Sequence, residues 1–404
     1  MSRRIRKARR HGTRDGFTLV EFLLAAVVTL GLAGVIFNFV APAHRIFQAQ
    51  PEQSDLQQRL RVTVDTFTRD LVMAGAGTYL GPAAGPLTYA VAPIFPYKAF
   101  GDMPDSAQGT FFRRDAISFL YVPATPAQTT LEQPLAASAL DAQLAWMPNC
   151  PPATATQLCG FKNGDRLMIF DRESQWDIYT AGQVGAGFVT LQHRGAPAAA
   201  RYEIGAAVSE VRLGSYSLKS DDTNRIYQLM RHDGWATELP VVDDVVDLAF
   251  DYFGDPEPPR LTGKPLDEMP GPWTTYGPAP PPLTQTQGSW PAGENCTFLV
   301  ANGSHAPRLP VLSGGGASNV QLTPGILTDG PWCPNVVAAN RFDADLLRVR
   351  RVRMTLRVQA ALASLRGPAG LLFLKGGTAR AGERYVPDLE VQFDVTPRNM
   401  NLGR

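Results

Sequence analysis

An uninterrupted apolar stretch near the N-terminus constrains this chain more than any other feature. Residues 22–41 contain no charged side chain, and about 20 apolar residues are enough for a helix to cross the hydrocarbon core of a bilayer. Seven basic residues precede the stretch, within residues 1–16. Because positively charged flanks are retained on the cytoplasmic side, this distribution predicts a membrane anchor with the remainder of the chain exported.

Glu21 lies just inside the start of this apolar segment, where an ionised side chain costs up to about 2.5–3.5 kcal/mol on insertion scales. An ordinary anchor does not explain such a residue, and the apolar stretch is too long for a cleavable secretory signal. The basic leader ending at Gly16, the following FTLVE and the apolar stretch resemble the prepilin signal of type IV pilins and type II secretion pseudopilins. The resemblance implies cleavage between Gly16 and Phe17 and N-methylation of Phe17. It also implies subunit docking through Glu21, whose carboxylate would neutralise the new amine of a neighbouring subunit.

The helical pattern continues beyond the membrane segment. Apolar residues recur at spacings of four, four, three and four, which indicates one buried face of a soluble helix: Leu56, Leu60, Val64, Phe67 and Leu71. We expect a membrane part at 17–41 and a soluble part at 42–77, with Pro42 and Pro51 kinking or locally unwinding the helix. Gly75 and Gly77 should end it.

Residues 78–404 have the pattern of a β-rich head. Strands are predicted at 115–122, 165–171, 245–253, 351–359 and 389–395. In 351–359 the apolar residues alternate with outward Arg351, Arg353, Thr355, Arg357 and Gln359. In 389–395 the outward residues are Glu390, Gln392 and Asp394. These complementary faces predict antiparallel neighbours in one sheet, with the arginines on a solvated face rather than on nucleic acid. Residues 17–404 hold 31 basic and 36 acidic side chains, which also argues against a nucleic-acid partner.

The strand patterns and the closing RNM resemble the PilW-like minor pilins, which are related to the J-type pseudopilins of secretion systems. This resemblance implies an α+β, pilin-like fold and a structural subunit that primes assembly of a type IV pilus at its tip. The implied partners are a prepilin peptidase/methyltransferase, other minor pilins, the major pilin, the inner-membrane assembly platform and membrane lipid. The implied location is the inner membrane with the head in the periplasm, and then the pilus. A J-like pseudopilin, an anchored adhesin that never enters filaments and an exported anchored enzyme remain alternatives.

A proline-rich region separates two of the predicted strands. Residues 254–334 hold 16 of the 34 prolines, a composition typical of long functional or disordered loops. Its aromatic residues, such as Trp290, argue against full disorder. We expect an insertion at about 254–340 that contacts a partner or a ligand, or serves as a passive spacer. Deletion of residues 260–335 should then leave the head folded.

Four cysteines are present, Cys150, Cys159, Cys296 and Cys333. An even number in an exported chain favours disulfides. Spacing favours Cys150–Cys159 and Cys296–Cys333, although four cysteines permit three pairings. A zinc site built from all four thiolates is the rival interpretation, but there is no CxxC spacing to support it.

No catalytic pattern is recognisable in the chain. The five histidines are scattered, and no HExxH, P-loop or nucleophile-elbow motif occurs. The acidic pairs Asp221–Asp222 and Asp243–Asp244 match no known calcium loop. We therefore expect no enzymatic activity, no cofactor and no metal.

Overall fold

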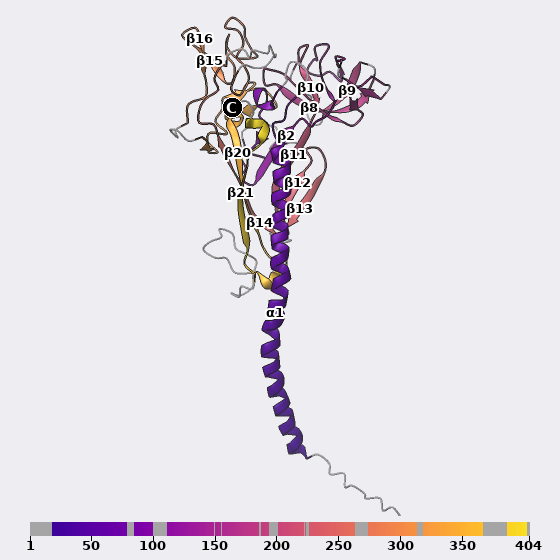
Figure 1. The fold of residues 1–404 in the computed structure, drawn as a ribbon, viewed down its shortest axis with the longest axis vertical. Coiled ribbons are helices and arrows are strands. Elements are labelled where there is room, and N and C mark those ends of the chain that lie inside the picture. The colour runs from indigo at the N-terminus through magenta and orange to yellow at the C-terminus, as the bar shows by residue number, and fades with distance from the viewer. Residues whose placement is uncertain are drawn as a thin grey trace, which may run out of the picture.

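The structure is a computed structural model that shows a long helix carrying a β-rich head (Figure 1). It describes residues 18–78, 85–99, 111–148, 150–154, 156–185, 187–193, 201–221, 223, 226–262, 274–312, 318–366 and 386–401. The predicted leader, Gly16 and Phe17 therefore lie outside the described residues. The α+β class expected from the sequence is confirmed, with one N-terminal apolar helix and several antiparallel sheets.

Helix α1 (Leu19–Val72) is 54 residues long, which corresponds to about 80 Å at 1.5 Å per residue. Pro42 and Pro51 lie inside it without interrupting it, so the predicted local unwinding is absent. Figure 1 shows a gentle bend. The helix ends at Val72, slightly before the predicted glycines, and Gly75 then adopts a φ of +80°, which a glycine tolerates.

The second half of α1 packs into the head through the predicted apolar face. Leu56, Phe67 and Leu71 are fully buried, whereas Leu60 and Val64 are half-buried. Phe67 is in the centre of this contact, surrounded by aromatic rings from three different strands. The apolar face is therefore where the helix is anchored to the head.

Two antiparallel sheets share one hydrophobic core with the helix. The five-stranded sheet has the order β1 (Ile94–Phe95), β2 (Ala116–Tyr121), β11 (Arg212–Asp221), β12 (Ile226–His232) and β13 (Glu238–Asp243). The four-stranded sheet has the order β17 (Val320–Leu322), β14 (Val245–Gly254), β20 (Val349–Val358) and β21 (Leu389–Val395). Short 3-10 helices connect these elements at Leu87–Tyr89, Ala344–Arg348, Ala363–Leu365 and Arg398–Asn401.

A third, six-stranded sheet forms a separate lobe with its own core. Its order is β3 (Gln128–Thr130), β10 (Ala207–Glu210), β7 (Arg166–Phe170), β8 (Trp176–Val184), β9 (Phe188–His193) and β4 (Asp141–Gln143). Three two-stranded ribbons complete the described strands: β5 (Gln157–Leu158) with β6 (Phe161–Lys162), β15 (Phe298–Ala301) with β16 (Ser304–Pro307), and β18 (Trp332–Cys333) with β19 (Phe342–Asp343).

The predicted pairing of the two charged strands is confirmed. β20 and β21 are antiparallel neighbours in which Arg353 is opposite Asp394, and Arg353 Nε lies 2.7 Å from Asp394 Oδ1. Arg357 and Gln359, which we expected on the solvated face, are instead fully buried. The end of β20 is covered by neighbouring chain, and Arg357 lies 3.9 Å from the buried Asp388. The alternation of apolar and polar residues along β20 predicts the face of the sheet on which Arg357 lies. It does not reveal whether other parts of the chain cover that face.

The region between β14 and β20 differs more strongly from expectation. Its described residues contribute to the main core, among them Tyr276, Leu309 and Leu327. The guanidinium of Arg348 is fully buried and donates to the backbone oxygens of Asp255, Pro256 and Pro310. These contacts argue against the expectation that deletion of 260–335 leaves the head folded, because a buried cation would lose one of these acceptors and the core would lose part of its filling.

Candidate functional site: the first turns of the long helix

The N-terminal half of α1 is an apolar rod with no cover from the rest of the described chain. Its most apolar segment, Leu19–Asn38, has a mean hydropathy of 2.4 and no buried residue. Large apolar side chains such as Phe22, Leu30 and Phe37 are each about seven-tenths exposed. A surface of this composition is stable only in apolar surroundings. By length and composition, the segment is a membrane anchor or a signal sequence.

Glu21 has a defined partner at the start of this rod. Thr18 is the N-cap of α1, and its backbone nitrogen and Oγ1 donate to Glu21 Oε2 at 3.0 and 2.9 Å. In return, the backbone nitrogen of Glu21 donates to Thr18 Oγ1 at 3.3 Å. This reciprocal arrangement is a capping box, which satisfies backbone donors that would otherwise be free at the helix start.

The capping box gives Glu21 a role within its own chain that our sequence analysis missed. The signal was present, because Thr18 followed three residues later by Glu21 is the T-x-x-E pattern of such a box. Both hydrogen bonds that Thr18 donates to Glu21 go to Oε2, and no described residue donates to Oε1. The exposed Oε1 therefore remains able to accept a donor from outside the described chain.

The helix enters the head through a second polar cluster. Arg59 and Arg366 approach the two carboxylate oxygens of Asp244 at 2.9 Å each. Nearby, Glu52 Oε1 accepts hydrogen bonds from the backbone nitrogens of Ala361 and Leu362. Asp244, which we considered as a calcium ligand, thus joins the helix to the head.

The other acidic pair also has a local explanation as far as it is described. Asp221 Oδ1 accepts a hydrogen bond from the backbone nitrogen of Thr223 at 3.0 Å, a turn interaction typical of aspartate. Asp222 lies outside the described residues.

The four cysteines form the two disulfides that the spacing favours. Cys150 bonds Cys159 in the six-stranded lobe, and Cys296 bonds Cys333 in the main head. All four residues are described, and none has a free thiol. Each bridge ties together residues of one core, which stabilises that core by restricting the unfolded chain.

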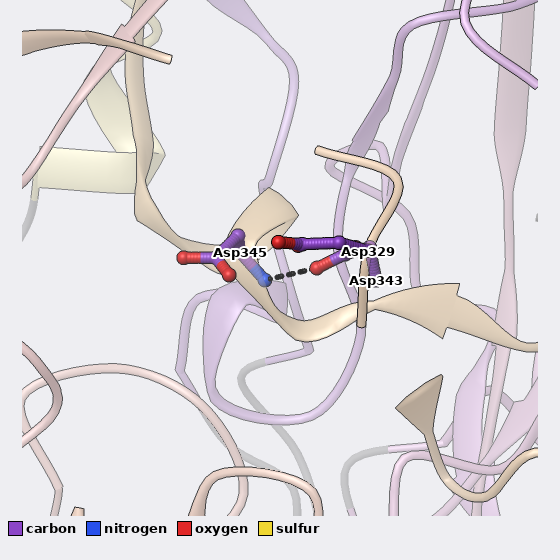
Figure 2. Close-up of side chains that lie close together, drawn as sticks. All are labelled: Asp329, Asp343 and Asp345. Atoms are coloured by element: carbon purple, nitrogen blue, oxygen red, sulfur yellow. Dashed lines mark hydrogen bonds between the residues drawn. The ribbon is translucent and has the colours of Figure 1, made fainter. Parts of the chain in front are cut away.

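Three carboxylates of the main head lie close together (Figure 2). One oxygen from each of Asp329, Asp343 and Asp345 lies within 4.8 Å of the others. Asp343 Oδ1 accepts from the backbone nitrogen of Asp345 at 2.8 Å, and Oδ2 accepts from that of Gly330 at 2.6 Å. Asp345 Oδ1 lies 2.5 Å from Arg348 Nε. These contacts cap the short helix Ala344–Arg348 and tie it to the preceding loop.

Burial raises the pKa of Asp343 to about 7, and the neighbouring Asp345 carboxylate adds to the rise. A folded-state pKa above the unfolded value means that the native state binds the proton more tightly. The stabilisation that protonated Asp343 contributes to the folded state is therefore lost as the pH rises from the pKa of the unfolded state through that of the folded state. The destabilisation caused by Asp343→Asn, whose side chain does not titrate, should then be larger at pH 5.5 than at pH 8 by about 1–2 kcal/mol.

Urea unfolding of both proteins at the two pH values measures this difference. Asp394→Asn serves as the control, because its arginine partners lower the pKa of Asp394 and leave it ionised at both pH values. An Asp343→Asn effect that does not change with pH would contradict the expected proton binding.

Comparison of the chain with models of known protein families, with curated proteins and with solved structures found no match. The functional interpretation therefore depends on the residues and geometry described above.

Proposed function

We propose that this chain is a minor pilin of the PilW-like type, a structural subunit that helps to prime a type IV pilus and is placed at its tip. The observation that carries the proposal is the division of α1 into two functional halves. Its first half is an apolar rod with Glu21 at the start, and its second half is anchored in a β-rich head. One helix of this kind can serve as a membrane anchor before assembly and as a contact between subunits afterwards.

The prepilin-like signal gives Glu21 a second partner. Cleavage between Gly16 and Phe17 would create an ammonium group four residues before Glu21, and methylation of Phe17 would retain its charge. In an assembled filament this cation needs an anion in apolar surroundings, and the free Oε1 of Glu21 on a neighbouring subunit can supply it. The capping box supports this role, because it orients Glu21 while occupying only Oε2.

The basic leader and the disulfides support a membrane precursor with an exported head. Positive residues before the apolar segment favour a cytoplasmic N-terminus, and two disulfides suit the oxidising periplasm. The proposed partners are the prepilin peptidase/methyltransferase, the inner-membrane assembly platform, membrane lipid, the major pilin and other minor pilins. The role is structural rather than catalytic.

The same helix would serve a J-like pseudopilin of a type II secretion system equally well, so this is the closest alternative. An anchored adhesin that never enters filaments is the other alternative, and in it Glu21 would serve only as the helix cap with Thr18. Recovery of the chain in sheared pilus fibres after crosslinking would support the pilus assignment. Recovery only with secretion components, or only in membranes, would support one of the alternatives.

Cleavage between Gly16 and Phe17 provides the direct test of the prepilin-like signal. Mass spectrometry of the mature protein should show a terminal peptide that begins at methylated Phe17. Gly16→Leu should block cleavage, because a side chain at this position prevents close approach of the peptidase to the backbone. Gly12→Leu, a matched change within the same leader, should be cleaved normally. An intact leader in wild-type filaments, or cleavage of both variants, would contradict the proposal.

A further inference from the structure

The six-stranded lobe is inserted into a hairpin of the main head. Strands β2 and β11 are antiparallel neighbours, and Tyr121 at the end of β2 is directly opposite Arg212 at the start of β11. The chain leaves the five-stranded sheet after Tyr121 and returns beside the same point. Val122 and Val211, which flank the excursion, are both buried in the main core. Residues 123–210 therefore enter and leave the head at one place.

The sheet of this lobe closes on itself. The two outer strands in its order are β3 and β4, yet the residues around them are joined by an antiparallel bridge between Leu131 and Leu144. The backbone nitrogen of Ala145 donates to Thr130 oxygen, and that of Glu132 donates to Gln143 oxygen, both at 2.9 Å. As far as it is described, the lobe is thus a small closed barrel in which β3 and β4 are joined to each other instead of forming two open edges.

The barrel has a hydrophobic core that is distinct from the core of the head. The described residues that form it all lie between Ala127 and Val208. Alternation along β7 separates the two cores, because Leu167 and Ile169 belong to the barrel whereas Met168 and Phe170 belong to the main core. The Cys150–Cys159 disulfide lies within the same range. The barrel therefore contains what a small domain needs to fold.

The contact between barrel and head involves one side of the barrel. Trp176 stacks on Phe95 with a ring-centroid distance of 5.7 Å. Arg166 of β7 pairs with Asp233 of the head at 3.0 Å. Asn340 donates to the backbone oxygen of Trp176 at 3.0 Å. Figure 1 shows the labelled strands β8, β9 and β10 beside the upper head, at the end of the molecule opposite the start of α1.

The region between β14 and β20 provides a contrast. It also connects two paired strands, since Gly254 is opposite Val349. However, it forms no second core among its described residues: residues such as Tyr276, Leu309 and Leu327 belong to the main core, and β17 within it extends the four-stranded sheet. Both excursions thus contribute buried residues to the main core, residues 123–210 through Met168, Phe170, Trp176 and Ala207, but only residues 123–210 also enclose a core of their own.

We propose that residues 123–210 are a self-contained module that unfolds independently of the head and can be removed without destroying it. The head and α1 would then retain membrane insertion and filament assembly, while the barrel adds an outward surface. The statement about assembly rests on the proposed function. The statement about folding is independent of the proposed function.

Hydrogen exchange of the full chain in detergent tests independent unfolding. Val189 is fully buried in the barrel core, and Val189→Asp should abolish amide protection between residues 127 and 208 while β14 and β20 keep theirs. Gln192→Asp, an exposed change on the same strand, should leave both regions protected. Loss of protection in β14 and β20 by Val189→Asp would overturn the proposal, because it would show one cooperative unit.

Removal of the module is the second test of the proposal. Residues 123–210 are replaced by Asn-Gly, which connects the adjacent strand ends through a short turn and removes Cys150 and Cys159 together. The shortened chain should retain a cooperative unfolding transition and protected amides in β14 and β20. Aggregation or loss of that protection would overturn the folding proposal. Normal folding with a tenfold or greater loss of filament incorporation would instead contradict only the statement about assembly.

Discussion

Replacing Phe67 by alanine is expected to lower the free energy of unfolding of the head by about 3–5 kcal/mol. The ring is fully buried. It lies 5.3 Å from Tyr216, 5.5 Å from Phe250 and 5.9 Å from Phe393, measured between ring centroids. These three neighbours come from β11, β14 and β21, so one side chain on α1 joins both sheets of the main head. Its loss leaves a cavity that three separate strands would have to close together.

The matched control is Phe47→Ala, on the same helix. The side chain of Phe47 is 74% exposed, so its removal should change the free energy of unfolding by less than about 0.5 kcal/mol. Urea unfolding of the detergent-solubilised full chains, followed by tryptophan fluorescence, measures both values. A loss below about 1 kcal/mol for Phe67→Ala would show that the helix is held to the head chiefly by other contacts.

Sequence patterns predicted the elements whose burial follows a regular period. The four-four-three-four spacing from Leu56 to Leu71 located the buried face of α1. Strict alternation identified β20 and β21, and their opposite charges predicted that the two strands are antiparallel neighbours, as the structure shows with Arg353 opposite Asp394. In these elements each residue's environment follows from local geometry, which is why a one-dimensional pattern was sufficient.

The errors arose where burial depends on distant parts of the chain. Proline content indicated an insertion between β14 and β20, but composition does not reveal that a buried Arg348 binds three backbone oxygens of that region. The barrel escaped notice because several of its strands are only three to six residues long, as with β3 and β4. Its closure depends on the pairing of residues near Leu131 with residues near Leu144. Such short strands carry almost no periodic signal.

The candidate site was predicted in part. The sequence identified Glu21 as a residue that needs a partner, yet it was the structure that showed Thr18 as one such partner. Two explanations for Glu21 now coexist, a helix cap within the subunit and an anion for a neighbouring subunit. They make different demands on the side chain, because a cap needs hydrogen-bond geometry whereas an ion pair also needs charge.

Glu21→Gln separates these two demands. Glutamine at this position still completes a capping box with Thr18, but it cannot neutralise an ammonium group. Removing one partner of an ion pair in apolar surroundings costs about 3–5 kcal/mol. We therefore expect Glu21→Gln to enter the membrane normally and to be incorporated into filaments at least tenfold less than wild type, as a ratio of the immunoblot signals in sheared filaments and in membranes.

Thr18→Ala is the complementary variant, because it removes the cap and retains the carboxylate. Loss of an N-cap costs about 1 kcal/mol, and the membrane part of α1 is long enough to remain helical. Incorporation of Thr18→Ala should therefore stay within about fivefold of wild type, since about 1.4 kcal/mol corresponds to a factor of ten. The double change Glu21→Ala with Thr18→Ala should resemble Glu21→Gln, because the missing charge dominates. If Glu21→Gln assembles normally while Thr18→Ala does not, the carboxylate acts only as a cap, and pairing with a neighbouring subunit is not the reason for an acid at this position.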